Sequence, residues 1–436
     1  MHVNNISIQN FRGFEDEKFA LNTNFTVVIG DNGVGKSSLL YALQVALGAY
    51  FQCLPIPASP VYRRQFKREE KYVKWDINEK DYIFNREETQ VQVEVEFALN
   101  KRIEWTRVML ANGTTSHSRK HAGQLLDSVE DLLQKKDESK KVLLPVVASF
   151  GTERTVAQQR KGKLAQKRRS RMEKGYLAAL SAKVDFDGVI EWLHNYDSEL
   201  KYEKEFSGTR EAVFEAITTA IPYLEDVSYN CRYQELEAIV NIDDKHFGKK
   251  THSNMSDGLI AMLNLVAEVA FRCVILNGYL GRDAVKQSRG IVMIDELDMH
   301  LHPNWQRHIM HDLKKAFPNI QFIVTTHSPF IVQSVKSDEL IIIDDAIKKA
   351  GDPFKKSIEE VAAQEMGVQD IPRSIEFLEM QKVAERYYQL IATGKTSETD
   401  AQTRNLRKQL NELEERFGED PAFVAALKIE RQANNL

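Results

Sequence analysis

The chain is short of cysteine, of long apolar runs and of net charge, and each shortage excludes a class of protein. Three cysteines occur in 436 residues, and Cys53, Cys231 and Cys273 lie far apart without a CxxC pair. This excludes a disulfide scaffold or a zinc ribbon and favours a reduced, intracellular protein. No uninterrupted apolar stretch of about 18 residues is present, and the opening MHVNNISIQN does not have the form of a signal peptide. We therefore expect a cytoplasmic protein.

The formal net charge is −4, although charged residues make up 28% of the chain. The molecule is therefore not a polycation, and any contact with nucleic acid must come from a local patch. A chain of 436 residues is long enough for two or three domains with a sizeable core.

Hydrophobic periodicity predicts an α/β fold. Residues 3–11 (VNNISIQNF) alternate as in a strand, and VQVEVEFAL and RIEWTRVML form a predicted antiparallel hairpin at 91–110. Short apolar runs are typical of buried strands; they are NFTVVIG, VLLPVVASFG, GIVMIDE, IQFIVTTHS and DELIIIDD. Helical patterns stand between several of them, which predicts a parallel sheet covered on both faces. We expect four segments: an amino-terminal lobe (1–123), a helical and basic insertion (124–250), a carboxyl-terminal lobe (251–350) and a helical region (351–436).

A glycine-rich segment follows the first buried strand. Residues 30–37 (GDNGVGKS) fit G-x-x-x-x-G-K-[ST] at every fixed position, with a strand before and a helical pattern after. Its glycines allow successive backbone N–H groups to turn toward phosphate oxygens at the positive end of the new helix. Lys36 is predicted to reach the β- and γ-phosphates, and the Ser37 hydroxyl to bind Mg²⁺. The alternative, a glycine turn with a chance lysine, does not explain the flanking strand and helix.

Two later strands end in residues that complete a nucleotide site. GIVMI is followed by Asp295 and Glu296 at the carboxyl end of the strand, the edge at which α/β sheets bind ligands. Asp295 is predicted to hold Mg²⁺, and Glu296 to orient or deprotonate the attacking water. His327 ends the next strand and is a candidate γ-phosphate sensor. An acid pair or a histidine at the end of a strand is common by itself. Their order after the glycine-rich loop is what favours a nucleotide-hydrolysing site.

These motifs resemble those of ABC-type ATPases in the branch that contains RecF, Rad50, the SMC heads and the OLD-family ATPases. NFRGF at 10–14 is similar to the amino-terminal motif of that branch, in which the arginine, here Arg12, approaches the nucleotide. MSDGL at 255–259 resembles the ABC signature, although its methionine, aspartate and final leucine depart from the usual residues. ELDMHLHPNW stands where the D-loop falls, with Asp298 as the corresponding residue.

The resemblance implies a fold and a set of roles. The fold is an ABC-type P-loop NTPase head, a mixed sheet with flanking helices, carrying a helical insertion and a helical carboxyl-terminal segment. In such ATPases the phosphate loop of one head and the signature of a second head enclose the nucleotide, so a head-to-tail dimer is expected. The implied contacts to ATP and magnesium are made by Arg12, Gly30, Asn32, Gly33, Gly35, Lys36, Ser37, Ser38, Ser256, Gly258 and Asp298, with Asp295 on the metal and Glu296 and His327 in hydrolysis.

Further segments resemble the PtuA-type ATPases of Septu anti-phage defence systems, which also occur with retron cassettes. These segments are LLPVVASFGTER, DMHLHPNW and FGEDPAFVAALKIER. The resemblance implies a separate partner nuclease of HNH type and an assembly larger than a dimer. The alternative is a RecF-like repair ATPase that binds DNA directly. A transporter subunit fits less well because the signature and D-loop depart from that pattern, and this chain shows no nuclease constellation of its own.

Three other features have more than one interpretation. A basic run favours either a solvated helix face or contact with nucleic acid or an acidic partner; it contains Arg154, Arg160, Lys161, Lys163, Lys167, Arg168, Arg169, Arg171 and Lys174. Four histidines at 300–311 invite a zinc site, which we disfavour because the acid pair already accounts for this loop and no cysteine lies near it. An apolar stripe at Leu406, Leu410 and Leu413 indicates either packing or docking of a second protein.

Overall fold

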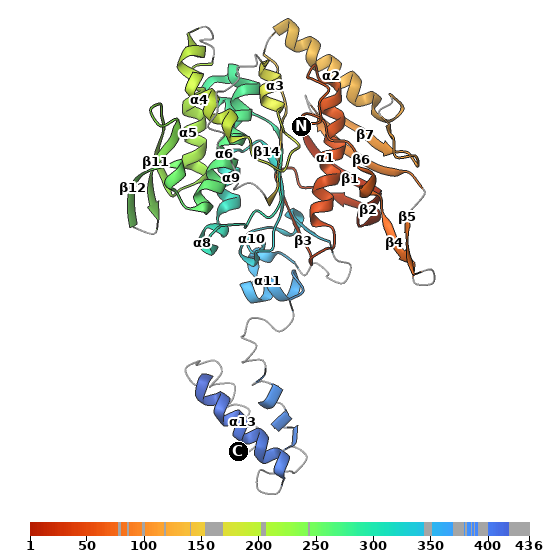
Figure 1. Cartoon of the computed structure of the whole chain (residues 1–436), viewed down its shortest axis with the longest axis vertical. Coiled ribbons are helices and arrows are strands. Elements are labelled where there is room, and N and C mark those ends of the chain that lie inside the picture. Colours follow the sequence, from red (N-terminus) through yellow and green to blue (C-terminus); the bar gives the residue numbers. More distant parts are fainter. Residues whose placement is uncertain are drawn as a thin grey trace. The chain divides into compact units, whose positions relative to one another are not determined.

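A five-stranded sheet of parallel strands lies at the centre of the computed structural model (Figure 1). In spatial order its strands are β15 (Leu340–Ile342), β3 (Phe25–Ile29), β14 (Ile320–Thr325), β13 (Gly290–Ile294) and β9 (Val146–Phe150). All four pairings are parallel, and every residue of β3, β9, β13 and β14 is buried. Strands covered on both faces need continuous apolar side chains, which is why these runs form the sheet. The carboxyl ends of β3, β13 and β14 therefore lie along one edge.

The structure describes most of the chain, and all structural statements below concern that part. The described residues are 1–76, 80–84, 87–97, 101–116, 119–139, 141–152, 169–201, 206–242, 245–343, 351–368, 379, 382–384, 386–387, 389–390 and 400–417. They fall into two units, Met1–Gly367 and Val368–Leu436.

A second sheet in the first unit is antiparallel. Its strands, in spatial order, are β2 (Phe14–Ala20), β1 (His2–Phe11), β6 (Thr89–Phe97), β7 (Lys101–Met109) and β8 (Thr115–Ser116). β6 and β7 pair antiparallel, which confirms the predicted hairpin. Alternate residues of β6 are buried, as expected for a strand with one face on the core. A two-stranded ribbon, β4 (Val73–Asp76) with β5 (Asp81–Phe84), forms a separate sheet.

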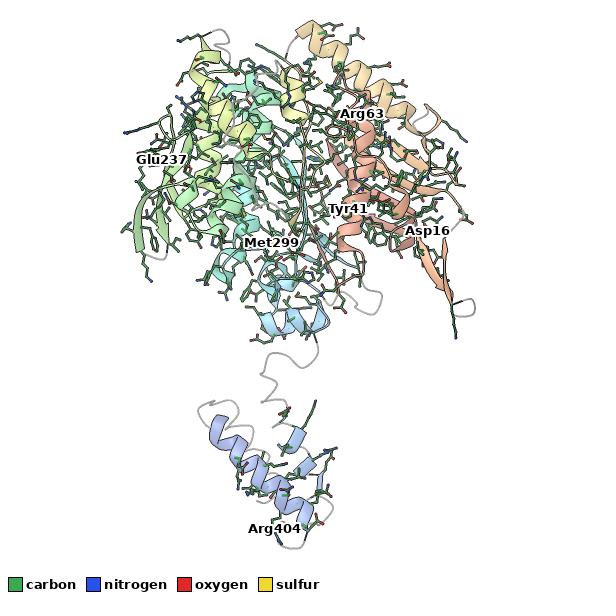
Figure 2. The ribbon with its side chains drawn as sticks, viewed as in Figure 1. Asp16, Tyr41, Arg63, Glu237, Met299 and Arg404 are labelled. Atoms are coloured by element: carbon green, nitrogen blue, oxygen red, sulfur yellow. The ribbon has the colours of Figure 1, made fainter. Side chains whose placement is uncertain are left out.

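Helices cover both faces of the parallel sheet (Figure 1). On one side α1 (Lys36–Cys53) packs between the parallel sheet and the antiparallel sheet, with α2 (Arg119–Ser139) beside it. On the other side α6 (Asp257–Asn277) packs against β9 and three further helices, which are α3 (Arg171–Tyr176), α4 (Phe186–Leu200) and α5 (Thr209–Ala220). Side chains from both sides form one continuous core (Figure 2). The remaining short helices of this unit are α7 (Ala284–Gln287), α8 (Pro303–Gln306), α9 (Ile309–Ala316), α10 (Pro329–Val332) and α11 (Ile358–Gln364).

Helix α6 is mostly apolar and is buried along almost its whole length. Asp257–Gln287, which begins with α6, is the one described segment long and apolar enough to cross a membrane by length and composition, and 94% of its apolar window is buried inside the fold. Glu268 and Arg272 form an ion pair within α6, and both side chains are almost fully buried. Arg272 also donates to the carbonyls of Gly175 (2.8 Å) and Leu177 (2.9 Å). These contacts make α6 an internal helix joined to the end of α3.

The segment 124–250, predicted as a helical and basic insertion, is only partly helical. Its last part forms a three-stranded antiparallel sheet of β10 (Leu224–Asn230), β11 (Glu235–Ile242) and β12 (Lys245–Thr251). In β11 buried and half-buried residues alternate. This period of two places one face of a strand on the core, whereas a helix would need a period near 3.6. Between β13 and β14 the chain forms two short helices, α8 and α9, and not one continuous helix. The carbonyl of Arg307, between them, accepts a hydrogen bond from the Ser334 hydroxyl (2.8 Å).

The second unit contains α13 (Ala401–Phe417). Asp400 starts this helix, because its carboxylate accepts hydrogen bonds from the Thr403 amide (3.0 Å) and hydroxyl (2.9 Å). Leu410 is fully buried and Leu406 is half-buried, so two members of the predicted apolar stripe pack within this unit. The Leu413 side chain and residues 418–436 lie outside the described part of the chain.

Candidate functional site

The phosphate loop joins the carboxyl end of β3 to the first turn of α1. Gly30, Gly33 and Gly35 have φ angles of 149°, 88° and 115°. A Cβ on Gly30 would lie 2.8 Å from the Ile343 carbonyl oxygen, and one on Gly35 would lie 2.9 Å from the Phe14 ring. Side chains are therefore excluded at both positions. Gly35 precedes α1 without a side-chain cap, so the first N–H groups of the helix are available to an anion.

Lys36 lies inside this loop. Its Nζ donates to the carbonyls of Gly30 (2.8 Å) and Asp31 (2.9 Å), and the residue is 8% exposed. Burial lowers the pKa of Lys36, although the negative charges of Asp295 and Asp31 oppose that shift. The ammonium group is thus held among backbone groups, where a phosphate can replace the carbonyls as its partner.

Asp295 and Ser37 meet across the gap between β13 and α1. The Ser37 hydroxyl donates to Asp295 Oδ1 (3.2 Å), and the Thr325 hydroxyl donates to the same oxygen (2.6 Å). A hydroxyl and a carboxylate are the hard oxygen ligands that Mg²⁺ prefers, so the two predicted ligands fit this ion. Sequence reasoning missed Thr325. The feature that could have indicated it is a hydroxyl residue at the carboxyl end of β14, the strand beside β13.

Thr325 also holds the backbone that follows Asp295. The amide of Glu296 donates to the Thr325 hydroxyl (2.8 Å), and the amide of Leu297 donates to the Thr325 carbonyl (2.9 Å). Glu296 has a φ of 51°, a conformation that is uncommon for a residue other than glycine. One hydroxyl therefore positions both members of the acid pair, and the turn directs the backbone out of the sheet.

The Asp298 carboxylate accepts hydrogen bonds from Thr326 and from the backbone of His327. Its Oδ1 accepts from the Thr326 hydroxyl (2.5 Å) and from the His327 amide (3.2 Å). The His327 residue is exposed beyond the end of β14. The predicted D-loop and the predicted sensor histidine are thus joined within one chain, with Asp298 fixing the backbone of His327.

The signature-like segment begins α6. Ser256 occupies the N-cap position of the helix and is exposed, as is Asp257. Gly258 packs against the backbone after β13, because a Cβ there would lie 2.4 Å from the His300 carbonyl oxygen. His300 itself has a φ of 65°. A glycine is therefore required where the signature-like segment meets the predicted D-loop.

Arg12 lies over the ring of Tyr41 in α1. Its guanidinium is 4.1 Å from the centre of the Tyr41 ring, and its Nη2 donates to Glu70 (2.9 Å). Glu70 is fully buried and also accepts from Arg64. Burial acts to raise the pKa of Glu70, but the hydrogen bonds and charges of Arg64 and Arg12 outweigh it and lower that pKa. Glu70 is a second residue that sequence reasoning missed.

The other predicted residues lie as follows. Asn32 is exposed in the loop, and Ser38 is half-buried in the first turn of α1. In the basic run, residues 154–168 are outside the described part; Arg171 stacks on Phe206, 3.2 Å from the ring centre, and Lys174 pairs with Glu199 (3.3 Å). The side chains of Arg171 and Lys174 therefore make contacts within the fold. Among the described residues no group of three or more histidine, cysteine, aspartate or glutamate side chains could hold a metal ion.

Comparison with known proteins shows the family to which this chain belongs. Residues 25–333, which run from β3 past the end of β14, match the family described as "AAA domain, putative AbiEii toxin, Type IV TA system". The chain belongs to this family. Membership and the geometry of the loop and acid pair together support ATPase activity, with ATP as the nucleotide and Mg²⁺ as the usual ion of such enzymes.

The chain is similar to two retron probable ATPases over nearly its whole length. It is 25% identical to the Retron Vc95 probable ATPase of Vibrio cholerae serotype O1 biovar El Tor, over 94% of this chain and 86% of that protein. It is 24% identical to the Retron Ec83 probable ATPase of Escherichia coli, over 99% of this chain and 86% of that protein. A shorter match joins 21% of this chain to 12% of the Septu protein PtuA of Bacillus mycoides (strain KBAB4), at 39% identity. These matches confirm the predicted resemblance.

Among solved structures, the chain is similar to an SMC head domain with an extended coiled coil from Pyrococcus furiosus. The TM-score is 0.47 at 14% identity, and the similarity covers 78% of this chain and 93% of that one.

Proposed function

We propose that this chain is the regulatory ATPase of an anti-phage defence system of the retron or Septu kind, in which its nucleotide state controls a separate nuclease of HNH type. The alignments to two retron ATPases support the setting, because they span nearly the whole chain. The observation that carries the ATPase activity is the convergence of Lys36, Ser37, Asp295 and Glu296 at one edge of the parallel sheet.

Each residue has a defined part in the proposed reaction. Lys36 and the first N–H groups of α1 bind the β- and γ-phosphates of ATP. Ser37 and Asp295 hold magnesium, which when bound neutralises charge on these phosphates. Glu296 orients the attacking water and accepts its proton, and His327 donates to the γ-phosphate. Thr325 keeps Asp295 and Glu296 in place.

The proposed catalytic unit is a pair of chains that share two sites. Ser256 is exposed at the start of α6, and α6 covers the face of the parallel sheet opposite α1 (Figure 1). The signature of one chain is therefore better placed to meet the phosphate loop of a second copy than its own. Ser256 and the amino end of α6 would then bind the γ-phosphate from outside.

Mixing two inactive variants tests the shared sites. Lys36→Ala removes phosphate binding by the loop, and Ser256→Glu places a negative charge where the γ-phosphate is expected. A mixed dimer still has one intact site, made of the loop from the Ser256→Glu chain and the signature from the Lys36→Ala chain. We expect ATPase activity to return on mixing, up to about a quarter of the wild-type rate if pairing is random. Two inactive proteins that stay inactive when mixed, although they form mixed dimers, would overturn the shared site.

Pull-down of the tagged full-length protein from its native host tests the nuclease partner, with wild type beside Glu296→Gln. This variant should bind ATP but hydrolyse it about 10²- to 10⁴-fold more slowly, and so accumulate the ATP-bound state. An HNH nuclease recovered in a fixed ratio, and in a different amount with Glu296→Gln, supports control by the nucleotide. Recovery of DNA and repair proteins without a nuclease would instead favour a RecF-like ATPase.

A further inference from the structure

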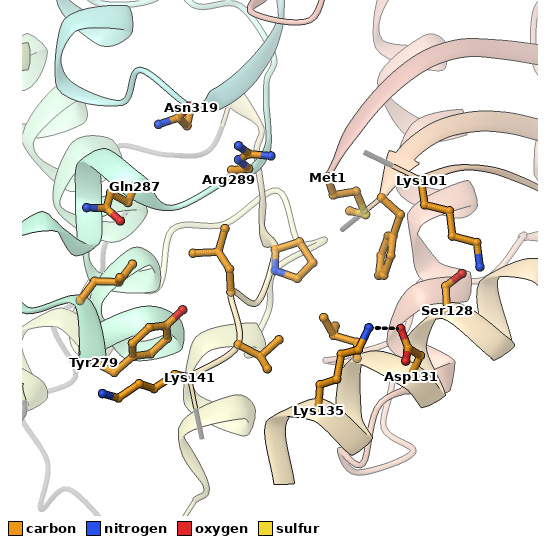
Figure 3. Close-up of a pocket in the computed structure, with 16 residues that line it drawn as sticks. Met1, Lys101, Ser128, Asp131, Lys135, Lys141, Tyr279, Gln287, Arg289 and Asn319 are labelled. Atoms are coloured by element: carbon orange, nitrogen blue, oxygen red, sulfur yellow. Dashed lines mark hydrogen bonds and ion pairs between the residues drawn. The ribbon is translucent and has the colours of Figure 1, made fainter. Parts of the chain in front are cut away.

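A cavity of about 800 Å³ lies at the opposite edge of the parallel sheet from the nucleotide site (Figure 3). Three of its lining residues directly precede central strands: Pro145 before β9, Arg289 before β13 and Asn319 before β14. The predicted phosphate-binding and catalytic groups follow the carboxyl ends of β3, β13 and β14. The length of the strands therefore separates the two places, about 15–20 Å for five or six residues.

Cations dominate the polar part of this cavity. Its charged lining residues are Lys101, Lys135, Lys141 and Arg289 against a single carboxylate, Asp131. Lys135 is paired with Asp131 at 2.8 Å (Figure 3). Lys101 and Arg289 have exposed side chains without an ion-pair partner among the described residues. The cavity therefore has an excess of positive charge that an anionic ligand would balance.

The rest of the lining is an apolar floor with hydrogen-bonding groups at its border. Phe97, Leu132 and Pro145 are buried and form this floor. Tyr279, Gln287 and Asn319 lie on the side of Arg289 and Lys141 (Figure 3), and supply a hydroxyl and two amides. A flat, apolar ring with polar edges suits such a surface, since the faces need apolar contact and the edges need donors and acceptors.

One wall of the cavity is held in place by buried hydrogen bonds. The Asn277 side chain, at the end of α6, accepts from the Leu144 amide (2.8 Å) and donates to the Leu144 carbonyl (3.0 Å). The Tyr176 hydroxyl donates to the Pro145 carbonyl (2.9 Å), and the Val146 amide donates to the Arg289 carbonyl (2.9 Å). The segment that carries Lys141 is thereby fixed to α3, α6 and the start of β13. A preformed wall lowers the cost of ordering a ligand.

We propose that this cavity binds a nucleoside phosphate, at a site separate from the phosphate loop. Arg289 and Lys101 bind the phosphate, the apolar floor packs against the base, and Asn319 and Gln287 contact the polar edges of the base. The volume is in the range of small-molecule sites, about 300–1,000 Å³. The phosphate can belong to a free nucleotide or to the end of a nucleic-acid strand, which offers the same chemistry.

Binding of AMP to the full-length Lys36→Ala variant tests the proposal. AMP lacks the β- and γ-phosphates, and Lys36→Ala removes their main ligand, so binding at the phosphate loop is suppressed. Equilibrium dialysis with labelled AMP should give a Kd below about 1 mM, the weak end of specific binding. Adding Arg289→Glu or Lys101→Glu should weaken binding at least about tenfold, as expected when a charge-assisted hydrogen bond is lost. The test does not depend on ATP hydrolysis, so it can succeed or fail independently of the proposed ATPase.

Lys18→Glu is the matched control, because Lys18 is an exposed lysine on β2 that does not line the cavity. It should change AMP binding less than about twofold. An equal loss in Lys18→Glu and Arg289→Glu, or no binding of AMP or of a 5′-phosphorylated oligonucleotide, would overturn the proposal. Binding of the oligonucleotide alone, dependent on its 5′-phosphate and on Arg289, assigns the ligand to a strand end. Binding that does not need the phosphate would also contradict the site.

Discussion

Thr325 is the residue whose replacement most directly tests the geometry of the acid pair. It is fully buried at the end of β14. Its hydroxyl donates to Asp295 (2.6 Å) and accepts from the amide of Glu296 (2.8 Å). Valine has nearly the same shape but can do neither. Thr325→Val should therefore loosen a predicted magnesium ligand and the predicted catalytic carboxylate together, without creating a cavity.

The size of the effect follows from these two bonds. A hydrogen bond to a charged group contributes about 1.5–3 kcal/mol, and an amide left without a partner costs about 1–3 kcal/mol when buried. Glu296 is only half-buried, so water can satisfy part of that cost, and we expect a total near 2–4 kcal/mol. If half of this is lost in the transition state, kcat falls about 5- to 30-fold, since 1.36 kcal/mol corresponds to a factor of ten.

Steady-state ATPase kinetics and thermal unfolding would separate positioning from stability. Thr325→Ser keeps the hydroxyl and should retain kcat within about threefold. Thr26→Val is the matched control, because Thr26 is a buried threonine of β3 whose hydroxyl accepts from the Asn22 amide (3.0 Å). It should lower stability by about 1–2 kcal/mol and leave kcat nearly unchanged. The reasoning is refuted if Thr325→Val keeps the wild-type kcat, or if Thr325→Ser loses as much as Thr325→Val.

Three further changes have defined outcomes. Lys36→Ala should weaken ATP binding at least about tenfold, since it removes a charge-assisted contact to phosphate; titration with a fluorescent ATP analogue measures this, and unchanged affinity would place the nucleotide elsewhere. Gly258→Ala should destabilise the fold by about 1–3 kcal/mol, because its Cβ would meet the His300 carbonyl at 2.4 Å, whereas Gly123→Ala, with nothing within 4 Å, should be neutral or stabilising in thermal unfolding. The lowered pKa of Glu70 means that its stabilisation is complete above the ordinary carboxyl pKa of 4.5 and is lost as the pH falls through the lowered value. Melting temperatures from pH 7 to pH 3 should thus fall less steeply at the acid end in Glu70→Gln than in wild type, and parallel curves would contradict the assignment.

The central sheet was predictable because its strands are continuous apolar runs. FTVVI, GIVMI and IQFIVT are mostly apolar and contain no charged residue, so burial on both faces was the simplest expectation. The sheet at β10–β12 was not predicted. Its last strand, KHFGKKT, is mostly exposed and carries three lysines, so it lacks the alternating apolar pattern that marks a strand. Pairing with β11 decides its conformation.

The candidate site was predictable where one short segment contains the chemistry. Lys36 and Ser37 follow the glycines directly, and Asp295 and Glu296 end an apolar strand, so local spacing was sufficient. Glu70 could not be found in the same way. It lies 58 residues from Arg12 along the chain, in a segment of mixed charge, and only the fold buries its carboxylate between two arginines.

By itself, the amino-acid sequence determined the phosphate loop, the order of the chemical motifs and the strands that present them, because each depends on a few adjacent residues and on the burial of apolar runs. The tertiary structure alone decided which groups hold those motifs. Thr325 reaches Asp295 because β14 and β13 are neighbours in the sheet, and Gly258 meets His300 because α6 begins beside the turn after β13. Such contacts join residues far apart in the chain, and their geometry is set by the packing of whole elements.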